Sequence, residues 1–165
     1  DCAVLLGQWA RQAGAEAVYG IHRSPVHAQR LAEMGIVPIA QHDTTAVNAA
    51  AAQAEVVYDA TGGSLAETIL SVMPETGTFV CYGLLSGQTF RQQGPLPRVA
   101  WFHIRNYLDA LSAEAWQAEF RRIWPKLRAS QCSDVTLYPL SEWQRAVGNY
   151  REAGRTGKPM LSMDN

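Results

Sequence analysis

The chain has 165 residues, about the length of one domain, and 47% of them are hydrophobic, so a folded core is expected. It contains no run of eighteen apolar residues that would predict a spanning helix, and its start lacks the basic flank of a signal peptide, so we expect a cytoplasmic protein without a membrane association. The net charge is −1, with 12 Arg against 2 Lys, which argues against a polybasic surface for nucleic acid.

Helical and strand patterns alternate along the first half of the chain. Apolar residues at helical spacing predict helices, and short buried runs predict strands. The expected helices cover residues 3–13, 26–34, 44–54 and 65–72, and the expected strands cover residues 17–21, 36–39, 55–60 and 78–83. Helical connections of this length need a parallel sheet covered on both faces, so the order predicts a doubly wound α/β fold. Pro38 removes a ladder donor and favours an edge position for the second strand.

The rhythm changes after residue 83. Residues 84–97 are a loop with several Gly and Pro, and its length is typical of functional loops. The alternation over residues 102–108 predicts a further strand. Later patterns predict a helix over 114–127, a helix through residues 143–150 and a last strand over 157–161. We expect Phe120, Ile123 and Leu127 to face inward, and we expect the aromatic helix residues to lie in the core or an interface, namely Trp116, Phe120, Trp124 and Trp143.

The chain opens inside a helix, with no strand before it. An α/β unit is normally nucleated on its first strand, so we expect a parallel sheet that lacks this strand. An N-terminally truncated fragment is the interpretation that fits this pattern.

Residues that could support other chemistry are few. Three cysteines lie far apart without a CxxC pattern, and the four histidines have no metal spacing, so neither a disulfide framework nor a zinc site is expected. No serine lies in a GxSxG context, which leaves a serine hydrolase without support. Asp59 ends a strand with no second acid near it in sequence, so helix capping or ribose hydrogen bonding is a better hypothesis than general base catalysis. No catalytic residue is predicted in this chain.

Several segments, in this order and spacing, resemble one family. They are Gln8-Trp9-Ala10 with Gly14-Ala15, Asp59-Ala60-Thr61-Gly62-Gly63, Tyr82-Gly83, residues 102–108 and Gly154-Arg155-Thr156-Gly157-Lys158. Together they are similar to the medium-chain dehydrogenase/reductase superfamily, on the side of the quinone oxidoreductases and 2-enoyl thioester reductases. The resemblance implies that residues 1–165 are an N-terminally truncated, Rossmann-like cofactor domain. It also implies that the catalytic domain is absent from the chain, and that this fragment alone is inactive.

The resemblance assigns the first helix to the cofactor pyrophosphate. Ala3 and Val4 stand at the beginning of that helix, where a helix N-terminus and a glycine-rich turn hold the phosphates in the family. Asp1 and Ala3 occupy positions where the family often has Gly, which is a departure from the pattern.

The residues that follow the strand predicted over residues 17–21 are the most informative motif. An NAD-preferring domain usually carries an acidic residue there for the ribose diol, but this sequence reads His22-Arg23-Ser24. A guanidinium and a hydroxyl suit a 2′-phosphate, so we expect the cofactor to be NADPH. A solvated turn arginine is the alternative. His42 stands where the resembling reductases often have a tyrosine near the adenosine; it could stack on the cofactor or be an exposed loop histidine.

Two further groups of residues are expected at the carboxyl edge of the sheet, where open α/β folds bind ligands. Thr61, Gly62 and Gly63 permit a close approach of the cofactor, although a glycine turn that starts a helix and binds nothing is the alternative. Tyr82, Gly83 and Leu84 are expected to face the nicotinamide end. For residues 105–107, packing or a dimer contact is a better hypothesis than cofactor contact.

The resemblance therefore implies an NADPH-dependent oxidoreductase whose full-length form transfers hydride to a small-molecule substrate, namely a quinone, an enone or a 2-enoyl thioester. The cofactor domain of a zinc-dependent alcohol dehydrogenase and a non-catalytic nucleotide-binding module remain alternatives. A methyltransferase would want an acid where Arg23 stands. If residues 102–108 form an edge strand, the unpaired amides invite a second copy, so we expect a homodimer through this strand.

Overall fold

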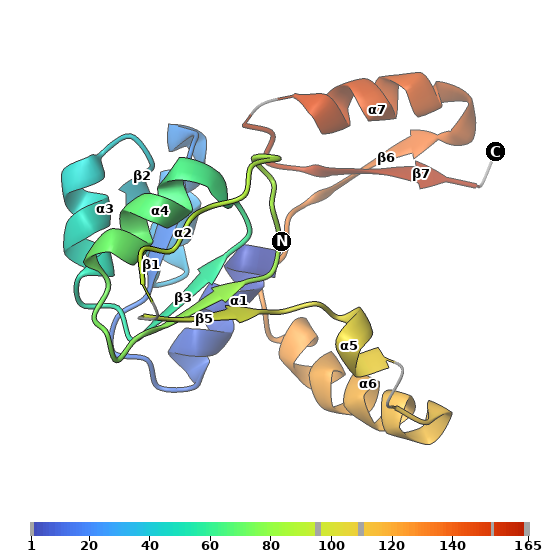
Figure 1. Ribbon diagram of the computed structural model, residues 1–165. Coiled ribbons are helices and arrows are strands. Elements are labelled where there is room, and N and C mark those ends of the chain that lie inside the picture. Colours follow the sequence, from blue (N-terminus) through green and yellow to red (C-terminus); the bar gives the residue numbers. More distant parts are fainter. Residues whose placement is uncertain (1, 95–96, 109–110, 153, 164–165) are drawn as a thin grey trace. The chain divides into compact units, whose positions relative to one another are not determined.

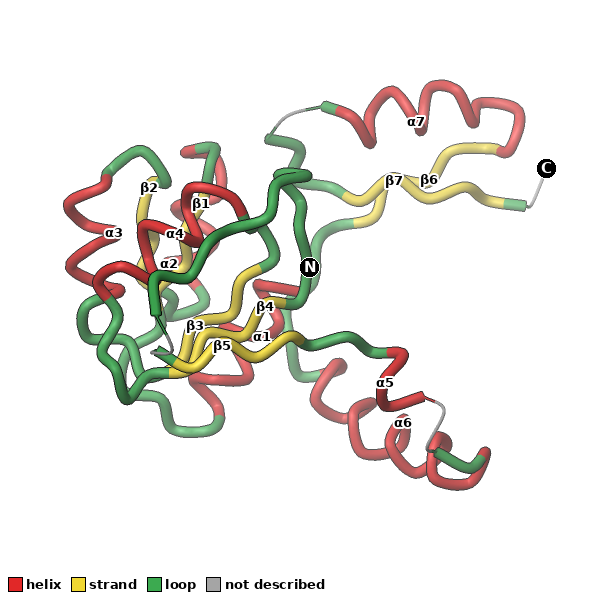
Figure 2. The backbone as a smooth tube through the Cα atoms, viewed as in Figure 1, coloured by secondary structure: helices red, strands yellow, loops and turns green. Residues whose placement is uncertain are grey.

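The computed structural model describes residues 2–94, 97–108, 111–152 and 154–163. The chain divides into two compact units: the first unit is residues 1–42 with 127–165, and the second unit is residues 43–126. Figure 1 follows the elements in chain order, and Figure 2 separates helices, strands and loops. In the described part of the chain, no helix combines the length and the apolar character that crossing a bilayer requires.

The first unit begins with a helix, a strand, a helical connection and a second strand. These elements are α1 (Cys2–Gln12), β1 (Tyr19–His22), the 3-10 turn η1 (Pro25–His27), α2 (Ala28–Glu33) and β2 (Val37–Ala40). The two strands are parallel, with residues 19–22 opposite residues 37–40. Ile36 is buried, and a Cβ on Gly7 or Gly20 would lie only 2.6 or 2.9 Å from its side chain. The two glycines therefore let α1 and β1 close on the same isoleucine.

A second pair of parallel strands, β6 (Val135–Pro139) and β7 (Lys158–Ser162), completes the first unit. The strands are connected by the 3-10 turn η2 (Leu140–Glu142) and the helix α7 (Trp143–Arg151). The Arg145 guanidinium lies 5.7 Å from the Tyr138 ring centroid, and Ala146 is buried. The elements α7 and β7 were predicted from the sequence, but β6 was not. A strand as short as β6 is stabilised mainly by pairing with β7, which lies about twenty residues further along the chain, so its own residues do not predict it.

The second unit holds a three-stranded parallel sheet with β4 in the centre. Its elements are α3 (Thr44–Ala51), β3 (Val56–Asp59), α4 (Gly63–Val72), β4 (Thr78–Cys81), β5 (Arg98–Trp101), α5 (Arg105–Leu108) and α6 (Ala113–Arg128), whose end crosses the boundary of the unit. Phe79 of β4 is fully buried and meets Phe90 edge to face at 5.4 Å between ring centroids. Buried alanine, valine, isoleucine and leucine side chains of α3 and α4 complete this core.

The predicted fold class is confirmed. Every pair of strands in the described residues is parallel, and helices connect β1 to β2, β3 to β4 and β6 to β7. The side chain of Asp43 caps α3 by accepting from the Ala46 N–H at 3.0 Å, as expected for its position before an alanine-rich helix. The missing first strand, like the division between this domain and a catalytic domain, stays a prediction.

The strand predicted over residues 102–108 is wrong. The strand that extends the sheet is β5, at residues 98–101, and the chain then turns into α5. The N–H of Tyr107 donates to the Ile104 carbonyl at 3.0 Å, as in a helical turn. Ile104, Tyr107 and Leu108 fit a helical spacing of three and four as well as they fit alternation, so the pattern alone could not separate the two structures.

The aromatic side chains of the later helices are not in the core. Phe120, Trp124 and Trp143 are 57%, 53% and 51% exposed, and Trp116 is half-buried. The expectation that Phe120 faces inward is therefore wrong, whereas a role of these residues in an interface stays a prediction.

Candidate functional site

The turn that follows β1 carries two polar side-chain groups, those of Arg23 and Ser24, that could bind a ligand. His22 ends the strand, Arg23 is exposed, and Ser24 precedes Pro25 at the start of η1 with an extended backbone and no capping hydrogen bond from its side chain. Within the described residues, the structure gives neither the Arg23 guanidinium nor the Ser24 hydroxyl a hydrogen bond or ion pair. A free guanidinium beside a free hydroxyl suits a ligand that carries a phosphate.

Positive charge extends from this turn into the following helix. The pKa of His27 is lowered, first by burial and then by the positive charges of His22 and Arg30. The Nδ1 atom of His22 is buried and has no hydrogen-bond partner in the part of the chain that the structure describes. A buried nitrogen without a partner next to a cationic turn fits a site that an anionic group completes.

His42 joins this region through the pairing of the strands. It is exposed and follows β2 by two residues, and the preceding residue, Gln41, donates its N–H to the His22 carbonyl at 2.8 Å. The carboxyl ends of parallel neighbours lie at one edge, so His22, Arg23 and His42 share that edge of the β1–β2 sheet. The structure therefore brings these three residues to one edge, and their contact with a cofactor stays a prediction.

The beginning of α1 is less informative. Ala3 is exposed and Val4 is half-buried in its first turn. Asp1, which the resemblance places in the pyrophosphate turn, lies outside the described residues.

The loop between α7 and β7 contacts the same turn within the first unit, which sequence analysis did not foresee. Gly154 has φ +75°, and a Cβ built on it would lie 2.9 Å from the Ser24 hydroxyl oxygen. Arg155 stacks on the Tyr150 ring at 4.4 Å and donates to the Tyr150 and Gly157 carbonyls at 3.0 and 3.1 Å. The only available signal was the Gly-Arg-Thr-Gly run itself, and its partner lies about 130 residues away.

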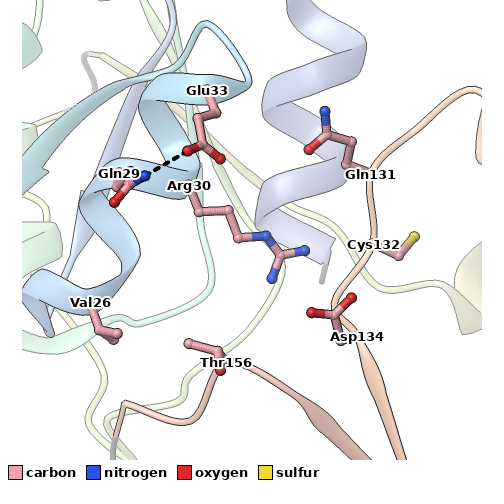
Figure 3. A pocket seen from close by; sticks show the side chains of 8 residues that line it. All are labelled: Val26, Gln29, Arg30, Glu33, Gln131, Cys132, Asp134 and Thr156. Atoms are coloured by element: carbon pink, nitrogen blue, oxygen red, sulfur yellow. Dashed lines mark hydrogen bonds between the residues drawn. The ribbon is translucent and has the colours of Figure 1, made fainter.

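A hollow of about 360 Å³ lies beside α2 (Figure 3). Its lining residues are Val26, Gln29, Arg30, Glu33, Gln131, Cys132, Asp134 and Thr156. The cation of Arg30 faces a lining that also carries two carboxylates, and the Gln29 amide donates to Glu33 at 2.8 Å. This mixture of charges does not favour a phosphate, and none of the predicted cofactor residues lines the hollow.

In the second unit, Asp59 organises the turn that begins α4. Its two carboxylate oxygens accept the N–H groups of Thr61 and Gly62, each at 2.9 Å, and the residue is 6% exposed. Gly62 and Gly63 have φ values of +69° and +63°, a region that side chains other than glycine rarely adopt. The structure therefore makes Asp59 the organiser of this turn and not a cap of α4, whose N-cap residue is Gly62 without a side-chain capping bond, and the turn requires glycine for its own conformation.

The predicted residues after β4 meet this turn. The N–H of Tyr82 donates to the Asp59 carbonyl at 2.8 Å, and a Cβ on Gly83 would lie 3.1 Å from the Ala60 carbonyl oxygen. Leu84 Cδ2 would lie 2.6 Å from a Cβ on Gly62. The two predicted groups, residues 61–63 and 82–84, thus lie together at the carboxyl edge of β3 and β4.

Two further observations concern reactive groups. Burial raises the pKa of the Cys81 thiol, the negative charge of Asp59 adds to this effect, and the thiol donates to the Gly83 carbonyl at 3.3 Å. A protonated thiol in a strand is a poor nucleophile. Among the described residues, no group of three His, Cys, Asp or Glu side chains is placed to hold a metal ion, so these residues do not fit a zinc centre.

Comparison with known proteins adds a family and a set of folds. The family model described as zinc-binding dehydrogenase matches residues 3–125. No curated protein matches the chain. The chain also resembles solved structures at identities below 25%, and the likeness to them is one of fold.

A Bacillus thuringiensis protein assigned as an NADPH:quinone reductase is 21% identical, with a TM-score of 0.77 over 96% of this chain and 52% of that chain. A mycobacterial protein solved in complex with NADPH is 16% identical, with a TM-score of 0.74 over 96% and 52%. A mutant enoyl thioester reductase from Candida tropicalis is 17% identical, with a TM-score of 0.67 over 94% and 49%. The chain therefore spans about half the length of these proteins.

Proposed function

This chain belongs to the zinc-binding dehydrogenase family, and we propose that it is the cofactor-binding part of an NADPH-dependent oxidoreductase. The observation that carries the proposal is the turn after β1, where Arg23 and Ser24 stand uncommitted in place of an acidic residue. A guanidinium forms forked, charge-assisted hydrogen bonds with a phosphate, and an acid at this turn would repel it. The phosphorylated adenosine of NADPH is therefore favoured over that of NADH.

Each unit offers residues for one end of the cofactor. Arg23, Ser24 and His42 would hold the adenosine 2′-phosphate and its base, beside the unpartnered buried Nδ1 of His22. Residues 61–63 and 82–84 would support the nicotinamide half, because the two mononucleotide halves of such a fold bind the two ends of a dinucleotide. When bound, the dihydronicotinamide supplies a hydride; the chain's own contribution is to bind and orient the cofactor.

The substrate belongs to the whole protein and not to this chain alone. Two neighbours of similar fold, the NADPH:quinone reductase and the enoyl thioester reductase, support a quinone, an enone or a 2-enoyl thioester as the hydride acceptor. We assign no acid or base to this chain, since both oxygens of Asp59 accept backbone N–H groups of the turn and Cys81 is buried and protonated. The chain alone is proposed to bind cofactor without turning over.

Calorimetric titration with NADPH and with NADH tests the proposal. Wild-type chain is expected to bind NADPH more tightly, and Arg23→Asp is expected to lower NADPH affinity by about 1–3 kcal/mol, the range for a hydrogen bond to a charged group, with little effect on NADH. Arg121→Asp, a matched charge reversal on an exposed arginine of α6, should change neither affinity. Equal affinities of the wild-type chain for the two cofactors would contradict the assignment of this turn.

A further inference from the structure

The loop that follows β4 is tied to the turn that follows β3. The Leu85 N–H donates to the Ala60 carbonyl at 2.8 Å, and the Ser86 N–H donates to the Thr61 carbonyl at 3.0 Å. The Ser86 hydroxyl donates to the same Thr61 carbonyl at 2.7 Å and accepts from the Gln88 N–H at 3.2 Å. One side chain therefore joins the loop both to the neighbouring turn and to the loop's own next residues.

The glycines of the turn form a socket for this loop. A Cβ on Gly62 would lie 2.6 Å from the Gln88 carbonyl oxygen and from Leu84 Cδ2, and a Cβ on Gly63 would lie 3.1 Å from the Ser86 hydroxyl oxygen. Real Cβ atoms essentially never approach other atoms to within 3.0 Å, so any side chain at Gly62 would move the loop. The space that a side chain at Gly62 would fill is therefore occupied by the loop that follows β4.

A second anchor holds the loop further along the chain. The N–H of Arg91 donates to the Glu67 carboxylate of α4 at 2.9 Å. At the first anchor, the side chain of Leu85 remains 84% exposed, whereas Leu84 packs toward Gly62 and is 40% exposed. The loop is thus fixed at two places and presents the apolar side chain of Leu85 at the first of them.

We propose that Ser86 is a positioning residue for the nicotinamide half of the cofactor, and that Leu85 is the apolar contact it positions. The proposal rests on the proposed function above. β3 and β4 are adjacent parallel strands, so the loop lies at the carboxyl edge where such folds bind ligands. Leu85 supplies an apolar surface for the ring, and the Thr61–Gly63 turn acts as the socket that holds the loop in place.

The test compares a whole cofactor with its adenosine half. NADPH binding is followed by the fluorescence of the dihydronicotinamide, and binding of 2′,5′-ADP, which lacks that ring, is followed by calorimetry. Ser86→Ala removes the hydroxyl and is expected to weaken NADPH binding about threefold to tenfold, which corresponds to the loss of one hydrogen bond, while 2′,5′-ADP binding stays unchanged. Leu85→Ala should show the same selectivity.

Matched variants separate position from stability. Ser86→Thr keeps the hydroxyl and should restore NADPH binding. Ser71→Ala removes a hydroxyl that donates to the Thr68 carbonyl at the same 2.7 Å on α4, and it should change neither ligand's affinity. Gly62→Ala pushes the loop out of its socket without removing a hydrogen-bonding group, and it should reproduce the effect of Ser86→Ala and speed hydrogen exchange at the Leu85 and Ser86 amides.

The outcomes distinguish the two levels of the proposal. Unchanged NADPH affinity in both Ser86→Ala and Gly62→Ala would refute the role of the loop and leave the proposed function intact. Equal losses of NADPH and 2′,5′-ADP affinity would show a general structural role and would also refute the inference. Failure of the wild-type chain to bind NADPH would refute the proposed function and the inference together.

Discussion

Replacing Asp59 by alanine is expected to destabilise the second unit by about 3 kcal/mol. The carboxylate accepts two backbone N–H groups at 2.9 Å in a residue that is 6% exposed, and hydrogen bonds to a charged group are worth about 1.5–3 kcal/mol each. Truncation leaves the buried Gly62 N–H without an acceptor, whereas the N–H of Thr61 is only partly buried and can partly be satisfied by water. The lower end of the range for each bond therefore gives the value.

Urea unfolding followed by circular dichroism measures this loss. Asp43→Ala is the matched control, because that aspartate caps a helix in the same unit and accepts a single N–H at 3.0 Å on the surface; it should cost about 1 kcal/mol. Asp59→Asn keeps one carbonyl acceptor and should fall between the two. If Asp59→Ala costs no more than Asp43→Ala, the role of Asp59 in stabilising the turn is refuted. If Asp59→Ala keeps full stability but loses cofactor binding, a contact between Asp59 and the cofactor ribose is the better explanation.

Two further predictions concern pH and assembly. The pKa of His27 lies below its unfolded value of 6.5, chiefly because the ring is buried, so the folded chain binds the proton more weakly than the unfolded chain does. The stability that depends on neutral His27 is present above pH 6.5 and declines as the pH falls from there toward the folded pKa; urea midpoints at about pH 7.5 and 5.5 should differ less in His27→Asn. The homodimer also remains a prediction, now through β5. Trp101 is 60% exposed on this strand, which pairs with β4 alone among the described residues, so Trp101→Lys should give a monomer by light scattering.

The turn after β1 shows how far local sequence could reach. The residues His22, Arg23 and Ser24 were expected between a strand and a helix, and they are found there, with Pro25 as the first residue of the helical turn. A strand end and a Pro-initiated helical turn depend on neighbouring residues, so a sequence reading can locate them. What the sequence could not reveal is that Gly154, far along the chain, lies against Ser24.

The glycines after β3 show the opposite case. Sequence analysis interpreted Gly62 and Gly63 as room for a ligand or as a helix start, and it gave Ser86 no role. The structure fills the space over Gly62 with the Gln88 carbonyl and gives the Asp59 carboxylate two backbone donors. The Asp59 contacts are local, but Gly62 and Gln88 lie 26 positions apart, and they meet only because β3 and β4 pair in parallel.

The parallel α/β class and the cationic turn could therefore be predicted from local sequence, since each of these depends on apolar spacing and residue types within a few positions. Tertiary contacts were needed to establish that residues 98–101 form the outer strand of the sheet and that residues 105–108 form a helix. Both patterns were locally acceptable, and the register against β4, with the burial of Phe79 beside it, selected one of them.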